Sequence, residues 1–380
     1  MPRILILHAS VGSGHRSAAL ALADAFGRKQ AAEVRVEDAL EHANPLFRQA
    51  YAGSYLDLTN RAPLLWQLFY QNTDLSDPDL IEITNRLRSA VERLGVNDLR
   101  RLLKKYRPAA VICTHFLPVD LLLQLKHSGA LPQPIYCVVT DFFAHTFWIE
   151  PGIDGYFVAS DMTRDLMVAR GIPPSIITVS GIPIKLEVAE PKTSAEARAR
   201  QGLPAEGPLI TLFGGGLQAE RVRTVVQSLL ASELPGTLAV VAGRNETLIE
   251  ALADLRDGPR MRLLLYAQID FVDDLVAASD LAITKAGGLI VSEILARGTP
   301  LVLIDPIPGQ EEWNADYVVC AGAGLQLRIA ESAPRAVEQL LAQPERLAQL
   351  RAGAQRAGRP RAALDIAEAV LEDLRSGRHA

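Results

Sequence analysis

Short runs of branched apolar residues alternate along the chain with segments of helical period, and the alternation occurs twice. Runs of this kind, each followed by a helix, predict parallel sheets covered by helices. The expected strands are residues 3–8, 33–37, 109–113, 135–139, 155–158 and 176–179 in the first half, and 209–213, 237–241, 261–266, 281–284 and 300–304 in the second. The predicted fold class is therefore α/β, with two doubly wound, Rossmann-like domains facing a cleft. Ligands are expected at the carboxyl ends of the strands.

The length supports this division, because 380 residues with 49% apolar residues supply enough material for two cores. We expect an N-terminal domain over residues 1–186, a linker over 187–207 and a C-terminal domain over 208–360. The linker prediction depends on three prolines, two glycines and many charges between 185 and 208. Residues 361–380 have helical period, and we expect a C-terminal helix that packs back on the N-terminal domain.

The overall charge and the cysteines limit the partners and the location. A net charge of -5 with 22% charged residues argues against a nucleic-acid partner. Cys113, Cys137 and Cys320 are far apart and odd in number, so we expect reduced core thiols and a reducing compartment. No run approaches the ~20 apolar residues of a spanning helix, and the start does not resemble a signal peptide. We expect a cytoplasmic protein that at most lies on a membrane.

A glycine-rich turn follows the first expected strand and opens a helix. It contains Gly12, Gly14 and His15, and the glycines would let the backbone approach a ligand near the helix start. The spacing alone fits a simple capped turn equally well. A dinucleotide fingerprint needs small residues where His15 stands. With an unperturbed pKa near ~6.5, His15 could accept a proton from an acceptor hydroxyl.

A second turn of this kind, Gly214, Gly215 and Gly216, follows the strand expected at 209–213. It repeats the order of strand, glycine turn and helix, which suits close approach by an anionic group. Taken alone, the triple glycine could equally be a plain turn.

A third turn decides between these alternatives. Gly287 and Gly288 end the strand at 281–284, and the following helix carries Glu293, which could accept hydrogen bonds from a ribose diol. After the next strand, Gln310 and Glu311 stand in a stiff proline turn and suit sugar hydroxyls. A purely structural role does not readily explain why the glycine turn with Glu293 is followed by the proline turn with Gln310 and Glu311.

These residues resemble the glycosyltransferase family that includes monogalactosyldiacylglycerol synthase and the bacterial processive diacylglycerol glucosyltransferase. The family is related to the lipid-linked GlcNAc transferase of peptidoglycan synthesis. The resemblance implies a GT-B fold, an inverting transfer, an acceptor in the N-terminal domain and a nucleotide sugar in the C-terminal domain. It rests on residues 12–16, 54–66, 140–148, 180–184, 213–216, 271–274 and 284–314.

The resemblance also implies roles for single residues. His15 matches the proposed catalytic base, and Phe271 lies where the uracil is bracketed. Glu293 matches the ribose ligand, and Gln310 with Glu311 match the sugar-binding pair. One departure is Ala286, which replaces the proline usual before the two glycines.

Further polar residues are expected to border the acceptor side of the cleft. Asp141 and His145 follow the fourth expected strand, and a structural role is about as probable for them as contact with the acceptor or with His15. Gly14 belongs to the same side. His115 follows another strand but has no further support in the sequence.

Residues 45–72 form an insertion rich in aromatic and aliphatic residues, and part of it should pack on the core. The remainder, with Trp66, Phe69 and Tyr70, is expected to contact the membrane and the acyl chains. Residues 86–107 are strongly basic, which could be a solvated helix face but beside this insertion favours attraction to an anionic bilayer.

The predicted function is the inverting transfer of a hexose, glucose or galactose, from a UDP-sugar to diacylglycerol or a related lipid, giving a β-glycolipid. No cluster has metal-ligand spacing, so no cofactor or metal is expected. The alternatives are a UDP-sugar epimerase, a catalytically silent UDP-sugar sensor and a dinucleotide-dependent oxidoreductase. The expected location is the inner face of the cell membrane, bound peripherally.

Overall fold

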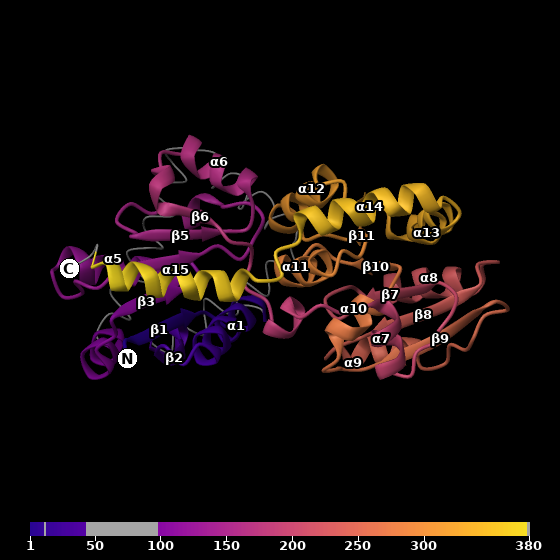
Figure 1. Cartoon of the computed structure of the whole chain (residues 1–380). Coiled ribbons are helices and arrows are strands. Elements are labelled where there is room, and N and C mark those ends of the chain that lie inside the picture. The colour runs from indigo at the N-terminus through magenta and orange to yellow at the C-terminus, as the bar shows by residue number, and fades with distance from the viewer. Residues whose placement is uncertain (11–12, 43–97, 378–380) are drawn as a thin grey trace. The chain divides into compact units, whose positions relative to one another are not determined.

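A computed structural model describes residues 1–10, 13–42 and 98–377, and these residues divide into two compact units (Figure 1). The first unit comprises residues 1–186, 308–310 and 361–380, and the second comprises 187–307 and 311–360. Each unit is built on one parallel sheet, as the two rounds of strand and helix predicted.

The first unit contains a six-stranded parallel sheet in the order β2-β1-β3-β4-β5-β6. Its strands are β1 (Arg3–His8), β2 (Glu33–Asp38), β3 (Ala110–Cys113), β4 (Ile135–Val138), β5 (Gly155–Val158) and β6 (Ile177–Val179). All six expected strands are present. The order reverses between β1 and β3, which is where a doubly wound sheet leaves room for a ligand beyond the strand ends.

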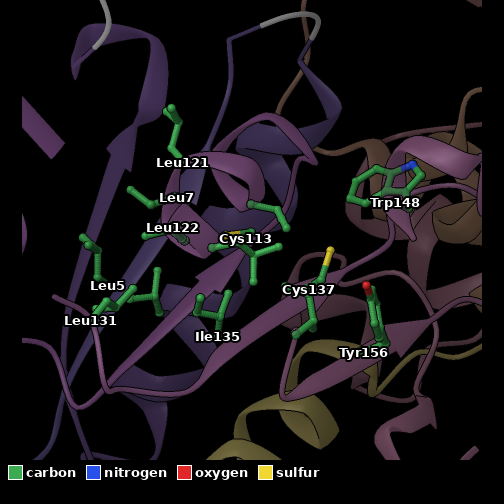
Figure 2. Close-up of a cluster of buried hydrophobic side chains, with 14 of the residues drawn as sticks. Leu5, Leu7, Cys113, Leu121, Leu122, Leu131, Ile135, Cys137, Trp148 and Tyr156 are labelled. Atoms are coloured by element: carbon green, nitrogen blue, oxygen red, sulfur yellow. The ribbon is translucent and has the colours of Figure 1, made fainter. Parts of the chain in front are cut away.

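Helices cover both faces of this sheet because each carries an apolar stripe. The α-helices are α1 (Gly14–Arg28), α5 (Leu117–His127), α6 (Asp161–Ala169) and α15 (Ala362–Ser376), and the short 3-10 turns are η1 (Ala39–His42), η2 (Thr146–Trp148) and η3 (Pro174–Ile176). One core cluster joins Leu5 and Leu7 of β1 to Cys113, Ile135 and Tyr156 of the neighbouring strands (Figure 2). Cys113 and Cys137 are buried free thiols, whereas Cys320 is exposed.

The C-terminal helix α15 packs on α1 of the first unit. Ile366, Ala367 and Val370 form its buried face. At its edges Lys29 Nζ lies 2.6 Å from Glu368 Oε1, and the Tyr136 hydroxyl donates to Asp373 Oδ2 at 2.5 Å. The chain thus returns to its N-terminal half to complete the first unit.

The second unit contains a six-stranded parallel sheet in the order β12-β11-β10-β7-β8-β9. Its strands are β7 (Leu209–Phe213), β8 (Gly236–Val241), β9 (Met261–Tyr266), β10 (Leu281–Thr284), β11 (Leu301–Ile304) and β12 (Gly324–Leu327). The first five were predicted. β12 was not predicted, because Gly-Leu-Gln-Leu is short, begins with glycine and is only half-buried at an edge of the sheet. The order reverses between β10 and β7.

The helices of the second unit surround a core centred on β7, β8 and β10. They are η4 (Leu186–Ala189), α7 (Ser194–Arg200), α8 (Ala219–Leu230), α9 (Glu246–Leu252), α10 (Val272–Ala278), α11 (Gly288–Ala296), α12 (Gln310–Cys320), η5 (Ala330–Ser332), α13 (Ala333–Leu341) and α14 (Pro344–Ala357). The first residues of η4 and α12, Leu186 and Gln310, belong to the first unit.

Residues 187–207, which we expected to be a linker, are packed into the second unit instead. A capping box between Thr193 and Glu196 begins α7, and α7 packs against α10. The buried Arg198 side chain donates to the carbonyl oxygens of Ala278 and Gly207 at 3.1 and 2.9 Å. Proline and charge in this segment therefore reflect a docked helix and its turns, and not a free connection.

Candidate functional site

In the first unit, a group of polar side chains lies where the strand order reverses between β1 and β3. His15 stands in the first turn of α1, directly after the glycine-rich turn. Its Nδ1 lies 2.9 Å from the backbone oxygen of Thr114, which follows β3, and 2.9 Å from Oγ1 of Thr140, which follows β4. In return, the Thr114 hydroxyl donates to the His15 carbonyl oxygen at 2.9 Å. Residues that follow β3 and β4 thus hold the imidazole of His15, which itself follows β1.

These contacts determine which nitrogen of His15 carries the proton. A carbonyl oxygen can only accept, so Nδ1 must be the donor and the lone pair of the neutral ring lies on Nε2. Burial, with a smaller contribution from His8, lowers the pKa of His15 to about 4, although the hydrogen bond to Thr114 opposes the shift. At neutral pH His15 is therefore an uncharged imidazole whose Nε2 lone pair can accept a proton.

His115 lies beside His15, with ring centroids 4.4 Å apart in an edge-to-face arrangement. The Leu117 N–H donates to its Nδ1 at 3.0 Å, so the neutral ring carries its proton on Nε2. Burial lowers the pKa of His115 well below its usual value. The sequence offered only its place after a strand. The pairing of β3 with β1 is what brings it to His15.

Asp141 and His145 are both buried near this group, after β4. His145 precedes η2, and its Nδ1 accepts from the Phe147 N–H at 3.2 Å, so the imidazole caps this short turn. That contact favours the structural alternative for His145. Asp141 directly follows Thr140, the residue that contacts His15, and Gly14 is the first residue of α1.

In the second unit, two glycine turns meet where the strand order reverses between β7 and β10. Gly214, Gly215 and Gly216 follow β7. A Cβ on Gly214 would lie 2.6 Å from Leu248 Cδ2, and one on Gly215 would lie 3.2 Å from the Ala242 oxygen. Packing therefore leaves little room for a side chain at these two positions. A Cβ on Gly216 would instead meet the side chain of Lys285.

The second of these turns carries the start of α11 and the polar residues expected to bind a sugar. Gly287 is the N-cap of α11 and Gly288 its first residue. The buried Glu311 accepts from Lys285 Nζ at 2.7 Å through Oε1 and from the Ile307 N–H at 2.9 Å through Oε2.

Three further polar residues stand on α11 and α12. The buried Asn314 amide donates to the Ala286 carbonyl oxygen at 3.0 Å, which ties α12 to the turn before α11. Gln310 begins α12 next to Glu311, and Glu293 stands half-buried on α11. Two hydrogen bonds thus tie the turn before α11 to the first turns of α12.

Phe271 is the N-cap residue of α10, and its half-buried ring meets Tyr266 edge-to-face with centroids 5.6 Å apart. Ion pairs hold the first turn of α10. Arg297 contacts Asp273 at 2.5 Å, and Lys192 contacts both Asp273 and Asp274. A partly exposed aromatic ring on a rigid helix start can offer a flat face to a base.

Other predicted residues lie partly or wholly outside the described chain. Trp66, Phe69, Tyr70 and the rest of the insertion 45–72 lie outside it, and so does Gly12. Of the basic segment, residues 98–106 are helical, with Leu99, Leu102 and Tyr106 buried in the core. The basic side chains Arg101, Lys104, Lys105 and Arg107 are exposed. Among the helices described, none is long and apolar enough to cross a membrane.

Two family models match the chain, one in each half. The model for monogalactosyldiacylglycerol (MGDG) synthase matches residues 15–184, and the model for glycosyl transferases group 1 matches residues 195–357. A Bacillus cytotoxicus protein described as a processive diacylglycerol beta-glucosyltransferase is 30% identical over 98% of this chain and 94% of its own length. A Bacillus cereus protein with the same description has the same identity and coverage.

Solved structures are similar in fold. Acinetobacter baumannii MurG superposes with a TM-score of 0.65 at 17% identity, covering 98% of this chain and 100% of its own. The calicheamicin glycosyltransferase CalG4 gives 0.62 at 15% identity with 98% of both chains covered. Staphylococcus aureus MnaA with UDP gives 0.62 at 14% identity, covering 99% and 97%. The predicted GT-B type of fold, with its two doubly wound domains, is confirmed.

Proposed function

The chain belongs to the family of the processive diacylglycerol beta-glucosyltransferases, and we propose that it transfers a hexose from a UDP-sugar to diacylglycerol or a related lipid with inversion at the anomeric carbon. The observation that carries the chemical part is the Nδ1 contact of His15 with the Thr114 oxygen, which leaves Nε2 as a base.

The proposed step is a single displacement. His15 Nε2 takes the proton of the acceptor hydroxyl, and the acceptor oxygen forms a bond to the anomeric carbon. The bond from that carbon to the diphosphate oxygen breaks, and its electron pair leaves with UDP. An α-linked donor therefore gives a β-linked product. The Nδ1–H of His15 stays hydrogen-bonded to the Thr114 carbonyl oxygen throughout.

We propose that the second unit binds the donor. The glycine turns after β7 and β10 lie side by side because these strands pair, and the helix start at Gly287 offers backbone N–H groups to a diphosphate. Phe271 would stack on the uracil, Glu293 would bind the ribose diol, and Gln310 with Glu311 would bind the hexose. No metal ion or other cofactor is needed in this scheme, because backbone donors at the helix start stabilise the leaving diphosphate.

The acceptor side is proposed to work at an anionic membrane surface. The helix over residues 98–106 buries its apolar face and exposes Lys104 and Lys105, with Arg107 just beyond it. Such a basic face is attracted to anionic lipid at ~1 kcal/mol per residue near the surface. Trp66, Phe69 and Tyr70 are proposed to enter the lipid beside it. The proposed location is the cytoplasmic face of the cell membrane, bound peripherally.

The experiment is to incubate the protein with diacylglycerol vesicles and either UDP-glucose or UDP-galactose, and to identify lipid products by mass. We expect a lipid heavier by one or more hexoses with at least one donor, and one UDP released for each hexose added. Conversion of the donor to an epimer without a glycolipid would favour the epimerase. Donor binding without turnover would favour the sensor.

A further inference from the structure

Lys285 directly follows Thr284, the last residue of β10, and so stands where the strand order of the second unit reverses. Its side chain is 27% exposed, and its Nζ lies 2.7 Å from Oε1 of Glu311. Lys285 lies within the residues 284–314 that carry the family resemblance, but neither the resemblance nor the glycine spacing gives it a role.

The ammonium of Lys285 lies against the glycine turn that follows β7. A Cβ built on Gly216 would lie 2.5 Å from its Cε and 3.2 Å from its Nζ. A Cβ on Gly287, in the other turn, would lie 4.0 Å from the same Cε and 3.7 Å from Glu311 Oε1. The end of the lysine side chain thus occupies the space beside Gly216, next to the turn that starts α11.

Glu311 holds the lysine in this position. Its carboxylate is buried, and its second oxygen accepts from the Ile307 N–H at 2.9 Å, so the carboxylate cannot turn away without losing that bond. A long side chain that is already ordered loses less conformational entropy when it binds a ligand. The ammonium has three N–H groups, of which one bonds Glu311, so it can bind an anion without leaving its partner.

We propose that Lys285 is the cation that binds the diphosphate of the donor and of the UDP product. The inference rests on the proposed function, since it assumes that a nucleoside diphosphate lies at these two glycine turns. Backbone N–H groups at a helix start supply only a partial charge, whereas Lys285 supplies a full one. It stays protonated in the transfer and stabilises the negative charge that the diphosphate oxygen gains when the bond to the anomeric carbon breaks.

The test compares binding of UDP with binding of uridine, which lacks the phosphates, by titration calorimetry. Removing Lys285 alone would also leave the Glu311 carboxylate without its cation, and its negative charge would then repel UDP. The decisive comparison is therefore made with Glu311→Gln as the parent and Lys285→Met added to it. Arg335→Met on α13, which removes an exposed positive charge from the same unit, is the matched control. Lys285→Arg tests whether a displaced cation suffices, and melting temperatures check folding.

Adding Lys285→Met to Glu311→Gln should weaken UDP binding roughly 10- to 100-fold, the range for losing a hydrogen bond to a charged group, and leave uridine binding unchanged. In the same Glu311→Gln parent, Lys285→Arg should weaken UDP binding less than Lys285→Met does. If UDP binding is unchanged by Lys285→Met in the Glu311→Gln parent, or falls by the same factor as uridine binding, the inference is wrong. A wild-type protein that binds no UDP would overturn this inference and the proposed function together, whereas glycolipid synthesis with intact UDP binding in the lysine variants overturns only the inference.

Discussion

His15 Nδ1 lies 2.9 Å from the backbone oxygen of Thr114, across the junction between β1 and β3. A backbone carbonyl cannot be titrated, so the proton stays on Nδ1 and the ring presents Nε2 as its base over the whole range in which it is neutral. Many catalytic histidines depend on a carboxylate for this orientation. Here the strand pairing supplies it, and Thr140 adds a hydroxyl contact.

The first prediction concerns the loss of this base. His15→Ala should lower turnover by roughly 10² to 10⁴, the usual contribution of a positioned general base, with UDP affinity nearly unchanged. Turnover and melting temperature are to be measured on one preparation. His127→Ala, an exposed histidine on α5, is the matched control.

A purely structural His15 would behave differently. The variant would melt at a lower temperature, but its turnover per folded molecule would stay close to that of the wild type. That result would remove His15 as the base and make Asp141 the next residue to test.

The second prediction concerns pH. In the folded chain burial lowers the pKa of His15 to about 4, whereas an unperturbed histidine in the unfolded chain titrates at about 6.5. Between these values the unfolded chain binds more protons at this position, so the free energy of unfolding falls as the pH falls from about 6.5 to about 4.

The measurement is the melting temperature across that pH window. His15→Gln removes this titration, so its melting temperature should decline less than that of the wild type from pH 6.5 to pH 4. His127→Gln should decline as the wild type does. Equal declines for all three proteins would show that His15 is not held neutral by burial.

The third prediction concerns Glu293 on α11. Glu293→Gln keeps the shape of the side chain but replaces charge-assisted hydrogen bonds to the ribose with neutral ones, which are about half as strong. UDP should bind roughly 10-fold more weakly by calorimetry, with the fold intact. Glu345→Gln, an exposed carboxylate on α14, should change nothing. Unaltered UDP affinity in the Glu293 variant would exclude this residue from the donor site.

The fourth prediction concerns the exposed basic face of residues 98–107. The double variant Lys104→Glu, Lys105→Glu should bind anionic vesicles at least about 10-fold more weakly than the wild type, since each lysine contributes ~1 kcal/mol near the surface. The difference should shrink at high salt. Sedimentation with neutral and anionic vesicles measures both effects.

A matched control reverses two exposed charges in the second unit, Arg256→Glu with Arg260→Glu. It changes the net charge by the same amount. If this control loses as much binding, or if the wild type binds neutral and anionic vesicles equally at every salt concentration, the basic face does not hold the protein on the membrane.

Much of the fold was predictable because strand period and turn chemistry are local. Runs such as residues 155–158 and 281–284 became strands with the expected bounds, and the two glycine turns of the second unit lie at the point where its strand order reverses. β12 was not predicted, because its four residues begin with glycine and are too few to establish a period, and its position depends on pairing with β11.

The site was less predictable than the fold, because its contacts join residues far apart in the chain. His15 stood in a recognisable turn, but Thr114 and His115 reach it only through the register of β1 with β3. Lys285 is one charge in an apolar stretch, and its proposed role depends on its contacts with Gly216 and Glu311, which follow two other strands. The sequence predicts where strands end, and the sheet order decides which ends meet.

The most direct test of the account is the structure of the lipid made from UDP-glucose or UDP-galactose and diacylglycerol vesicles, with EDTA present throughout. The anomeric proton of the new glycoside is to be assigned by NMR. An inverting transfer by His15 without a metal predicts a β-linked hexosyl diacylglycerol in undiminished yield. An α-linked product, release of free hexose alone, or loss of the product in EDTA would contradict it.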